Sequence, residues 1–524
     1  MTFYFVTFCC AFAALGSFLF GYDSGVISSS IEQDAFLRQF GSPTLSDAVA
    51  GGIISSYIGG AIVGSVLASY ISDYYGRRMA LFIGGFLATL GAGLQGGAVN
   101  IAMLIIGRVI AGLAIGQMSA TIPVYCSEIA PPQTRGMLAG MQQWMIGLGF
   151  VVAQWVGYGC SLRGRDFSWR FPLSFQAAPA IILTCGVWLL PESPRWLIEK
   201  GREVEGRSVL ARLHLNQGAT NNQLLEHELF QIQESLASEK ESAIRSWHQL
   251  LISPRWRHRI FLACGLQVFT QCSGTNIISN YGPRLFQTLG FTASTSLMII
   301  GLWGALAQFW YTVIMLFIDK VGRRKLLIPS LLGMGAALCI EATLVRDIDF
   351  SNPSANPHAL RAAIAMFFVF SFFFTALGMI SWVYQTEIFP TPLRARGSSM
   401  ATATNWSVSL IFTQCSPIAL TNIGSNYFYC FAAFNWVAMV LVWVFYPETA
   451  GCSLEGVEEV FTTQFDDGHS ERSFVAANTP VAITPRSQIR HKGLHPLSMH
   501  PTYDTVSIDS SHSGSGDKIG TKEV

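Results

Sequence analysis

Long stretches without a charged residue are the feature that most constrains how this chain can fold. A bilayer core is about 30 Å thick, and a helix needs roughly 20 consecutive apolar residues to cross it. We count twelve such helices: six, a polar insert at about 192–258, and six more. The stretch 79–107 is divided between the third helix and the start of the fourth, which continues through 109–127, and the stretch 397–447 gives two helices. The uncharged stretches are residues 2–22, 48–72, 79–107, 109–127, 136–162, 171–191, 260–283, 285–318, 326–340, 362–386 and 397–447.

The composition agrees with a protein whose main solvent is lipid. Of the 524 residues, 51% are hydrophobic and 12% are charged, whereas a soluble domain is about 25% charged. A soluble globule could not cover its surface with so few charges, and a disordered chain would not be this apolar. The net charge of +1 argues against a nucleic-acid partner. The 11 cysteines form no CxxC pair, so we expect buried, reduced thiols and no metal or other cofactor.

Basic residues orient the helices, since cytoplasmic loops carry an excess of Lys and Arg. With a cytoplasmic N-terminus, fifteen basic residues lie beside the membrane on the inner side and seven on the outer side. We therefore expect both termini in the cytoplasm, and the plasma membrane as the location. The predicted domains are an N-terminal six-helix bundle (1–191), a cytoplasmic helical linker (192–258), a C-terminal six-helix bundle (259–447) and a cytoplasmic tail (448–524) that is mostly disordered beyond about 462.

The two halves of the chain carry the same three motifs in the same order. Such a repeat indicates a duplicated six-helix unit, and duplicated bundles place a substrate site between the halves near the membrane midplane. The pairs are Asp73-Tyr-Tyr-Gly-Arg-Arg78 with Asp319-Lys-Val-Gly-Arg-Arg324, Glu128 and Arg135 with Glu387 and Arg394, and Pro191-Glu192-Ser193 with Pro447-Glu448-Thr449.

All three repeated motifs fall at the inner ends of helices and combine acids with arginines. One interpretation is topological, because basic residues hold loops in the cytoplasm. The other is a set of ion pairs that closes the inner mouth cooperatively, and the recurrence of acid with base in both halves favours this inner gate. Its predicted members are Arg77, Arg78, Glu128, Arg135, Glu192, Arg323, Arg324, Glu387, Arg394 and Glu448.

These motifs resemble the major facilitator superfamily, and within it the sugar porter family. The resemblance covers about residues 15–460 and includes seven motifs in order. It implies the fold of that superfamily, an all-α membrane protein with two pseudo-symmetric six-helix bundles, and alternating access for a hexose, pentose, polyol or similar substrate. Trp196-Leu-Ile-Glu-Lys-Gly-Arg202 is most similar to fungal members. The further motifs are Phe20-Gly-Tyr-Asp-x-Gly-Val26, Gly107-Arg108, Pro123-x-Tyr125-x-x-Glu128, Pro191-Glu-Ser-Pro-Arg195-Trp-Leu, Gln271-x-Ser-Gly-x-Asn276 and Pro447-Glu-Thr-x-Gly451-x-Ser-Leu-Glu455.

Two charges, Asp23 and Arg108, lie clearly inside predicted spans, where charges are costly and usually functional. Counting residues from the helix ends puts them at similar depth, so they can pair. The second half has no counterpart. The resemblance implies that Asp23 binds a proton and that Arg108 is its partner; the alternative is an inert buried pair. Glu341 lies near an outer helix end, and we expect it to snorkel to the membrane surface.

A sugar site needs amide and indole donors with an aromatic platform. Each candidate could instead make an interhelical hydrogen bond or belong to an aromatic belt. Thr270, the segment 379–381 and Ala307 depart from the family pattern, which puts glucose itself in doubt as the substrate. The predicted substrate-binding residues are Phe20, Gln143, Gln271, Asn276, Trp382, Asn405 and Trp406.

The predicted function is transport of a sugar by alternating access, as a sugar:proton symporter, and a monosaccharide is the favoured substrate. The alternatives are a passive sugar facilitator, a non-transporting sugar sensor, and a carrier of a polyol or other polyhydroxylated substrate. An enzyme is not expected, since the sequence has no nucleophile–base pair, metal-ligand spacing or phosphate loop. The expected partners are a small sugar, protons and the lipid bilayer, with no nucleic acid, and we expect a monomer.

Overall fold

The computed structural model places the membrane-spanning part of the chain and the start of the insert. It describes residues 2–31, 33–40, 47–131, 134–163, 165–214, 253–279, 292–346 and 357–450, with short pieces at 225–226, 229–230 and 232–234 and with Phe461. Residues 1–471 form one unit. The predicted disordered tail beyond about 462, like most of the predicted linker after residue 214, lies outside the described residues.

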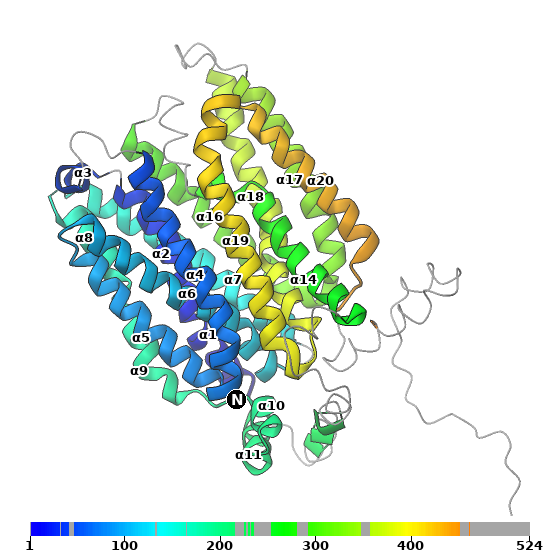
Figure 1. The fold of residues 1–524 in the computed structure, drawn as a ribbon. Coiled ribbons are helices and arrows are strands. Elements are labelled where there is room, and N and C mark those ends of the chain that lie inside the picture. Colours follow the sequence, from blue (N-terminus) through cyan, green and yellow to red (C-terminus); the bar gives the residue numbers. More distant parts are fainter. Residues whose placement is uncertain are drawn as a thin grey trace, which may run out of the picture. The chain divides into compact units, whose positions relative to one another are not determined.

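The described residues fold into helices, which Figure 1 shows side by side and roughly parallel in the membrane-spanning part. In the first half, the helices are α1 (Thr2–Ala13), α2 (Leu15–Ile31), α3 (Asp34–Phe40), α4 (Asp47–Tyr75), α5 (Arg77–Gly96), α6 (Ile101–Ile129), α7 (Arg135–Ser161), α8 (Phe167–Phe175), α9 (Ala177–Gly186) and the 3₁₀ turn η2 (Val187–Leu189). In the insert and the second half, they are α10 (Pro194–Glu199), α11 (Glu203–His214), α14 (Pro254–Cys272), α16 (Ala293–Val321), α17 (Arg323–Arg346), α18 (Pro357–Glu387), α19 (Thr391–Ile423) and α20 (Asn426–Phe445).

Ten helical segments among the described residues are long and apolar enough to cross a membrane. Helices α1 and α2 together make the first of them, and α8, α9 and η2 make the sixth. Helices α14 and α19 bring the number to the predicted twelve. Helix α14 falls outside the ten because three arginines lie among its first six residues, and α19 because it carries many amide and hydroxyl side chains.

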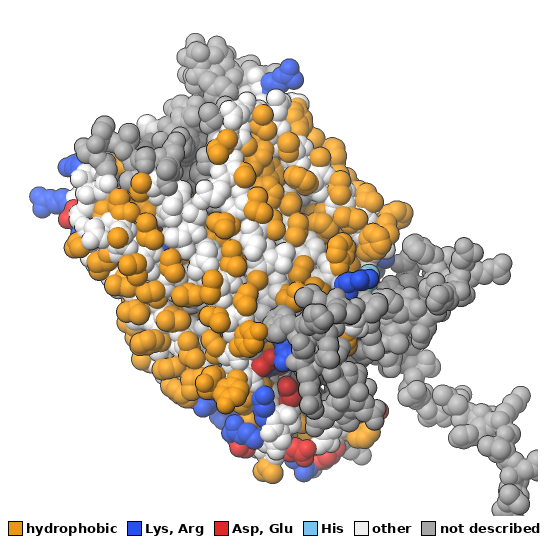
Figure 2. All heavy atoms as spheres, viewed as in Figure 1, with side chains coloured by type: hydrophobic (Ala, Val, Ile, Leu, Met, Phe, Trp, Pro, Cys, Tyr) orange, Lys and Arg blue, Asp and Glu red, His pale blue; other side chains and the backbone are white. Residues whose placement is uncertain are grey.

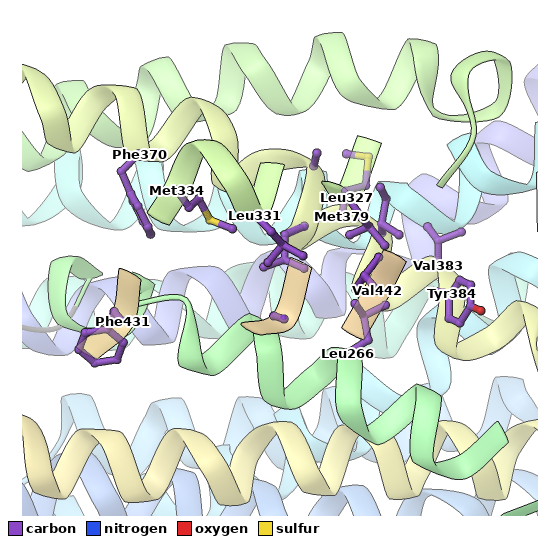
Figure 3. Close-up of a cluster of buried hydrophobic side chains, with 14 of the residues drawn as sticks. Leu266, Leu327, Leu331, Met334, Phe370, Met379, Val383, Tyr384, Phe431 and Val442 are labelled. Atoms are coloured by element: carbon purple, nitrogen blue, oxygen red, sulfur yellow. The ribbon is translucent and has the colours of Figure 1, made fainter. Parts of the chain in front are cut away.

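Each half has its own buried core. In the first half α4 packs on α6, α5 on α6 and α2 on α7; in the second half α17 packs on α18 and α20, and α14 on α19. Glycines allow the closest of these contacts: a Cβ at Gly64 of α4 would lie 2.1 Å from the carbonyl oxygen of Leu113 in α6. Figure 3 shows the second core, where Leu266, Leu331 and Val442 from three helices meet.

The outer surface of the bundles is apolar. Figure 2 shows hydrophobic side chains over the middle of one face and charged side chains gathered at the end where α10 and α11 lie. Phe261, Phe309 and Trp443 are among the large side chains that are half exposed or more on this surface. In water such a surface would be costly, whereas in a bilayer it faces acyl chains, so this is a multi-pass membrane protein. We call the end with α10 and α11 the inner end.

Glu341 does not snorkel, so that prediction is wrong. Its side chain is 1% exposed, and within the described residues neither carboxyl oxygen has a hydrogen-bond partner. The reason is rotational: Glu341 shares a helix face with Leu338, Ala342 and Val345, all of which are buried. Glu341 is therefore buried inside a span, as Asp23 and Arg108 are. It lies in the second half of the chain, whereas they lie in the first.

Replacing Glu341 with an apolar residue of similar length should stabilise the protein. A buried polar group without a partner costs about 1–3 kcal/mol, so we expect Glu341→Met to raise the free energy of unfolding by about that amount. Thermal unfolding in detergent measures it. Glu341→Gln is the matched control and should gain less, because it buries another polar group. A lower melting temperature for Glu341→Met than for the wild type would contradict this account.

Candidate functional site

A cavity with a volume of about 180 Å³ lies between the two halves. Helices α2, α4, α6 and α7 of the first half and α14, α16, α18 and α19 of the second contribute to its wall. All seven residues predicted to bind substrate line it, and so does Arg108. Residues separated by almost four hundred positions in the sequence, such as Phe20 and Trp406, meet here because the halves are packed side by side.

A break in the seventh span exposes amides to this cavity. Helix α14 ends at Cys272, and Gly274 follows with a φ of 98°, a conformation that favours glycine. Gln271 and Asn276 on either side of the break both line the cavity. The Asn276 amide donates a hydrogen bond to Gln271, and Gln271 Nε2 donates to Asn405 Oδ1 at 2.9 Å. Thr270, which departs from the family pattern, instead donates its hydroxyl to the Leu266 carbonyl of its own helix at 2.9 Å.

Aromatic rings form another wall of the cavity. The ring centroids of Phe20 and Trp406 are 4.7 Å apart, and those of Phe20 and Trp382 are 6.3 Å apart in an edge-to-face arrangement. The Trp382 indole donates to Gln143 Oε1 at 2.9 Å. Since Trp382 belongs to the second half and Gln143 to the first, this bond joins the halves beside the cavity.

The sequence analysis missed two tyrosines in the cavity wall. Tyr311 accepts a 3.0 Å hydrogen bond from Gln143 Nε2, and the ring of Tyr57 lies edge-on to Trp406 at 5.7 Å. Both lie inside uncharged stretches. The Tyr311 hydroxyl has Gln143 as its partner in place of water, whereas the described residues give the buried Tyr57 hydroxyl no hydrogen-bond partner. A search of the spans for tyrosines, alongside amides and tryptophans, would have found them.

Asp23 and Arg108 are in contact beside the same cavity. Arg108 Nη1 lies 2.8 Å from Asp23 Oδ1, and both side chains are 1% exposed. The guanidinium also lies 4.4 Å from the centre of the Tyr57 ring. Arg108 therefore reaches from the buried carboxylate to the cavity wall.

The repeated motifs make the same contacts twice at the inner ends of the bundles. Arg77 donates to both carboxylate oxygens of Glu128 at 3.0 Å, and Arg323 donates to both oxygens of Glu387 at 2.6 and 3.2 Å. Asp73 and Asp319, one turn before these arginines, add a second carboxylate to each cluster at 3.6 and 2.9 Å. The two aspartates belong to the repeat but were left out of the predicted gate.

Carboxylates from the third pair of motifs cap helix N-termini. Glu192 accepts from the backbone N–H groups of Arg77 and Arg78 at the start of α5, and Glu448 does the same for Arg323 and Arg324 at the start of α17. Each acid lies where the helix dipole favours negative charge. The preceding glycines have φ values of 96° and 100°, and a Cβ there would lie within 2.6 Å of the capping carboxylate. Burial raises the pKa of Glu192, and the N–H donors and the Arg77 charge act against that rise.

Charged side chains join the halves at the inner end. Arg394 lies 3.7 Å from Glu128, and Arg396 lies 3.6 Å from Asp73. Asp319 accepts hydrogen bonds from the backbone N–H groups at the start of α7, at 3.1 Å from Gly136 and 2.8 Å from Met137. Charged contacts between the bundles therefore lie at the inner end. Arg135 is buried at the same end, with 3% of its surface exposed.

The chain is similar to known transporters over most of its length. The sequence profile of the family described as "Sugar (and other) transporter" matches residues 9–461. The MFS-type transporter criB of Aspergillus cristatus is 33% identical over 86% of this chain and 92% of its own length. The galactose-proton symporter of Escherichia coli is 35% identical over 86% and 93%, and the quinate permease of Emericella nidulans is 30% identical over 86% and 87%.

A solved structure has the same fold. The proton:xylose symporter XylE bound to 6-bromo-6-deoxy-D-glucose superimposes with a TM-score of 0.76, at 25% identity, over 87% of this chain and 99% of that chain. The two-bundle architecture predicted from the repeat is thereby confirmed.

The two repeated glutamates should differ in their effect on the inner end. Glu128 faces Arg394 of the other half. Among the described residues, Glu387 has Arg323 and Thr449 as hydrogen-bond partners, and both belong to its own half. We expect Glu128→Gln to favour opening of the inner end by about 1 kcal/mol, about fivefold in the ratio of open to closed protein. Alkylation from the inner side of a cysteine introduced at Ser399, which is buried between the halves, measures the opening.

The matched control for this experiment is Glu387→Gln, which should change the alkylation rate less. Equal rates in the wild type and in Glu128→Gln would contradict the role of the inner ion pairs as a gate and would leave membrane topology as their role.

Proposed function

We propose that this chain, which belongs to the sugar transporter family of the major facilitator superfamily, carries a monosaccharide across the membrane together with a proton. It is a transporter and not an enzyme. The observation that carries the proposal is the cavity between the halves, which is lined by both amide side chains and aromatic rings. Uptake of a panel of labelled sugars by transport-deficient cells that express this protein tests it.

The lining of the cavity supports a sugar as the substrate. A sugar presents many hydroxyls and one apolar ring face, and it needs donors and acceptors beside an aromatic surface. Gln143, Gln271 and Asn276 supply amides from both halves, and Trp382 and Trp406 supply rings. Because both halves line the cavity, a bound sugar can stabilise one arrangement of the two halves over another, as alternating access requires.

The buried ion pair supports coupling to protons. A carboxylate inside a span is stable as an anion only beside its cation, and it takes up a proton when that cation moves away. Asp23 depends on Arg108 in this way, and Arg108 also lines the cavity. Movement of the cavity wall would then change the Asp23–Arg108 contact, and proton binding would follow sugar binding.

The proposal extends to the setting of the protein. We place it in the plasma membrane as a monomer with both termini in the cytoplasm, the side to which α10 and α11 project. The departures at Thr270 and Ala307, both of which line the cavity, favour a pentose, a hexose other than glucose, or a polyol over glucose itself. The sugar panel separates these substrates. Specific binding of a sugar without any uptake would identify a sensor instead.

Removing single amides from the cavity should weaken sugar affinity. We expect Gln271→Ala and Asn276→Ala each to raise the apparent KM by about two- to tenfold, because each loses a hydrogen bond that contributes about 0.5–1.5 kcal/mol. Surface labelling provides the control for expression. An unchanged KM in both variants would place the sugar elsewhere.

Neutralising Asp23 should uncouple transport from the proton gradient. Asp23→Asn keeps the shape of the side chain but cannot release a proton at physiological pH, so we expect uphill accumulation and its pH dependence to be lost while sugar exchange down a gradient continues. Accumulation with and without an uncoupler measures this. If uptake by the wild type is itself insensitive to pH gradient and uncoupler, the protein is a passive facilitator and Arg108 is a structural partner of Asp23.

A further inference from the structure

A chain of buried side-chain hydrogen bonds begins at the cavity and runs toward the inner end. Its first members are the cavity residues Asn276, Gln271 and Asn405. Asn405 Nδ2 donates to Gln267 Oε1 at 2.7 Å, so the chain leaves the cavity wall at Gln267, which does not line the cavity. Gln267 belongs to α14 and is fully buried.

The chain continues to the contact between the halves. Gln267 Nε2 donates to Gln385 Oε1 at 2.8 Å, and Gln385 Nε2 donates to Ser398 Oγ at 3.1 Å. Ser398 Oγ donates to the backbone carbonyl of Ala120 at 3.3 Å. Ala120 belongs to α6 of the first half, whereas all the side chains that form this series of hydrogen bonds belong to the second half. Gln385 and Ser398 are fully buried and line no part of the cavity.

All the bonds of this chain point in the same direction. Each amide accepts through its oxygen from the preceding side chain and donates through its nitrogen to the next, and the serine hydroxyl accepts from Gln385 and donates to Ala120. Turning one amide alone would oppose donor to donor or acceptor to acceptor in a site without water, which is costly. The direction is therefore shared, and its last acceptor is a carbonyl that cannot donate.

The direction of the chain decides what the cavity offers to a ligand. Asn276 Nδ2 gives one of its two hydrogens to Gln271, so its oxygen and its second N–H remain available beside the cavity. If the halves separated at the inner end, Ser398 would lose Ala120 as its acceptor, and its hydroxyl could instead donate to Gln385. Gln385 would then lose the support of its last partner, while Gln267 Nε2 keeps a second hydrogen bond to the Ser381 carbonyl at 3.2 Å, so the amides that face the sugar would shift in position without turning over.

We propose that Gln385 and Ser398 are positioning residues that couple the sugar site to the contact between the halves at the inner end. This inference rests on the proposed function, since it takes the amides of the cavity to be sugar ligands. The wild type then binds sugar while the Ser398–Ala120 bond supports the amides of the cavity, and it releases the sugar when loss of that bond shifts them.

A double-mutant cycle on the full chain tests the coupling. Ser398→Ala removes the last bond, and Gln385→Leu interrupts the chain one step earlier. We expect each to raise the KM for the transported sugar by about three- to tenfold, the effect of one hydrogen bond, although neither residue touches the cavity. Since both act through the same chain, the double variant should have the KM of Gln385→Leu alone. Maximal rates are normalised to the protein at the surface.

Two further variants separate positioning from a merely structural role. Ser398→Thr keeps a hydroxyl and should restore the wild-type KM, and Thr375→Val removes an equally buried hydroxyl from α18 that bonds only within its helix and should leave the KM unchanged. Gln385→Met replaces Gln385→Leu if the latter does not fold.

The outcomes distinguish a failure of this inference from a failure of the proposed transport function on which it rests. A wild type that takes up sugar, with an unchanged KM in Ser398→Ala and in the Gln385 variant, would overturn the coupling alone. If the fold-changes in KM of the two single variants multiply in the double variant, the two residues act independently, and this result would overturn the coupling as well. A wild type that takes up none of the sugars in the panel would overturn the proposed function and this inference together.

Discussion

Buried arginines are the constraint on which the rest of this structure depends. Five of the largest side chains that are fully buried among the described residues are arginines: Arg77, Arg108, Arg259, Arg323 and Arg394. A guanidinium that has left water needs carboxylates or carbonyls within reach, because an uncompensated buried charge costs several kcal/mol. The partners come from other helices or from the loops that connect them, so each arginine helps to fix how neighbouring helices are placed. Packing of apolar side chains alone, against a solvent that is equally apolar, would not specify these positions.

The repeat was readable in the sequence because its motifs are local, whereas the roles of its members depend on the fold. The spans, the bundles and the gathering of acids and arginines at the inner ends follow from uncharged stretches and from motifs that recur, whereas the pairing of Arg77 with Glu128 is known from the structure. The rotation of a helix about its axis does not, since it depends on neighbours that are distant in the sequence. Glu341 was therefore assigned to the membrane surface although it faces the bundle, and Tyr311 was missed although it contacts Gln143.

The candidate site divides in the same way. The four amides, two tryptophans and one phenylalanine that were singled out in the uncharged spans all line one cavity. Gln267 and Gln385 have the same chemistry and lie in the same spans but behind the wall, bonded to each other. Only the arrangement of α14, α18 and α19 separates an amide that reaches the cavity from one that supports it.

The two halves repeat their inner ends but not their interiors. The first half contains the Asp23–Arg108 pair, for which the second half has no counterpart at the repeated position, and the second half contains the connected amides. A duplicated bundle can change one copy in this way because the inner contacts, which both copies keep, maintain the shared frame. The ion pair then belongs to one half of the cavity wall and the connected amides to the other. The ring of Tyr57, which contacts both Arg108 and Trp406, links the two. In the mechanism proposed here, a movement that separates the halves therefore acts on both at once.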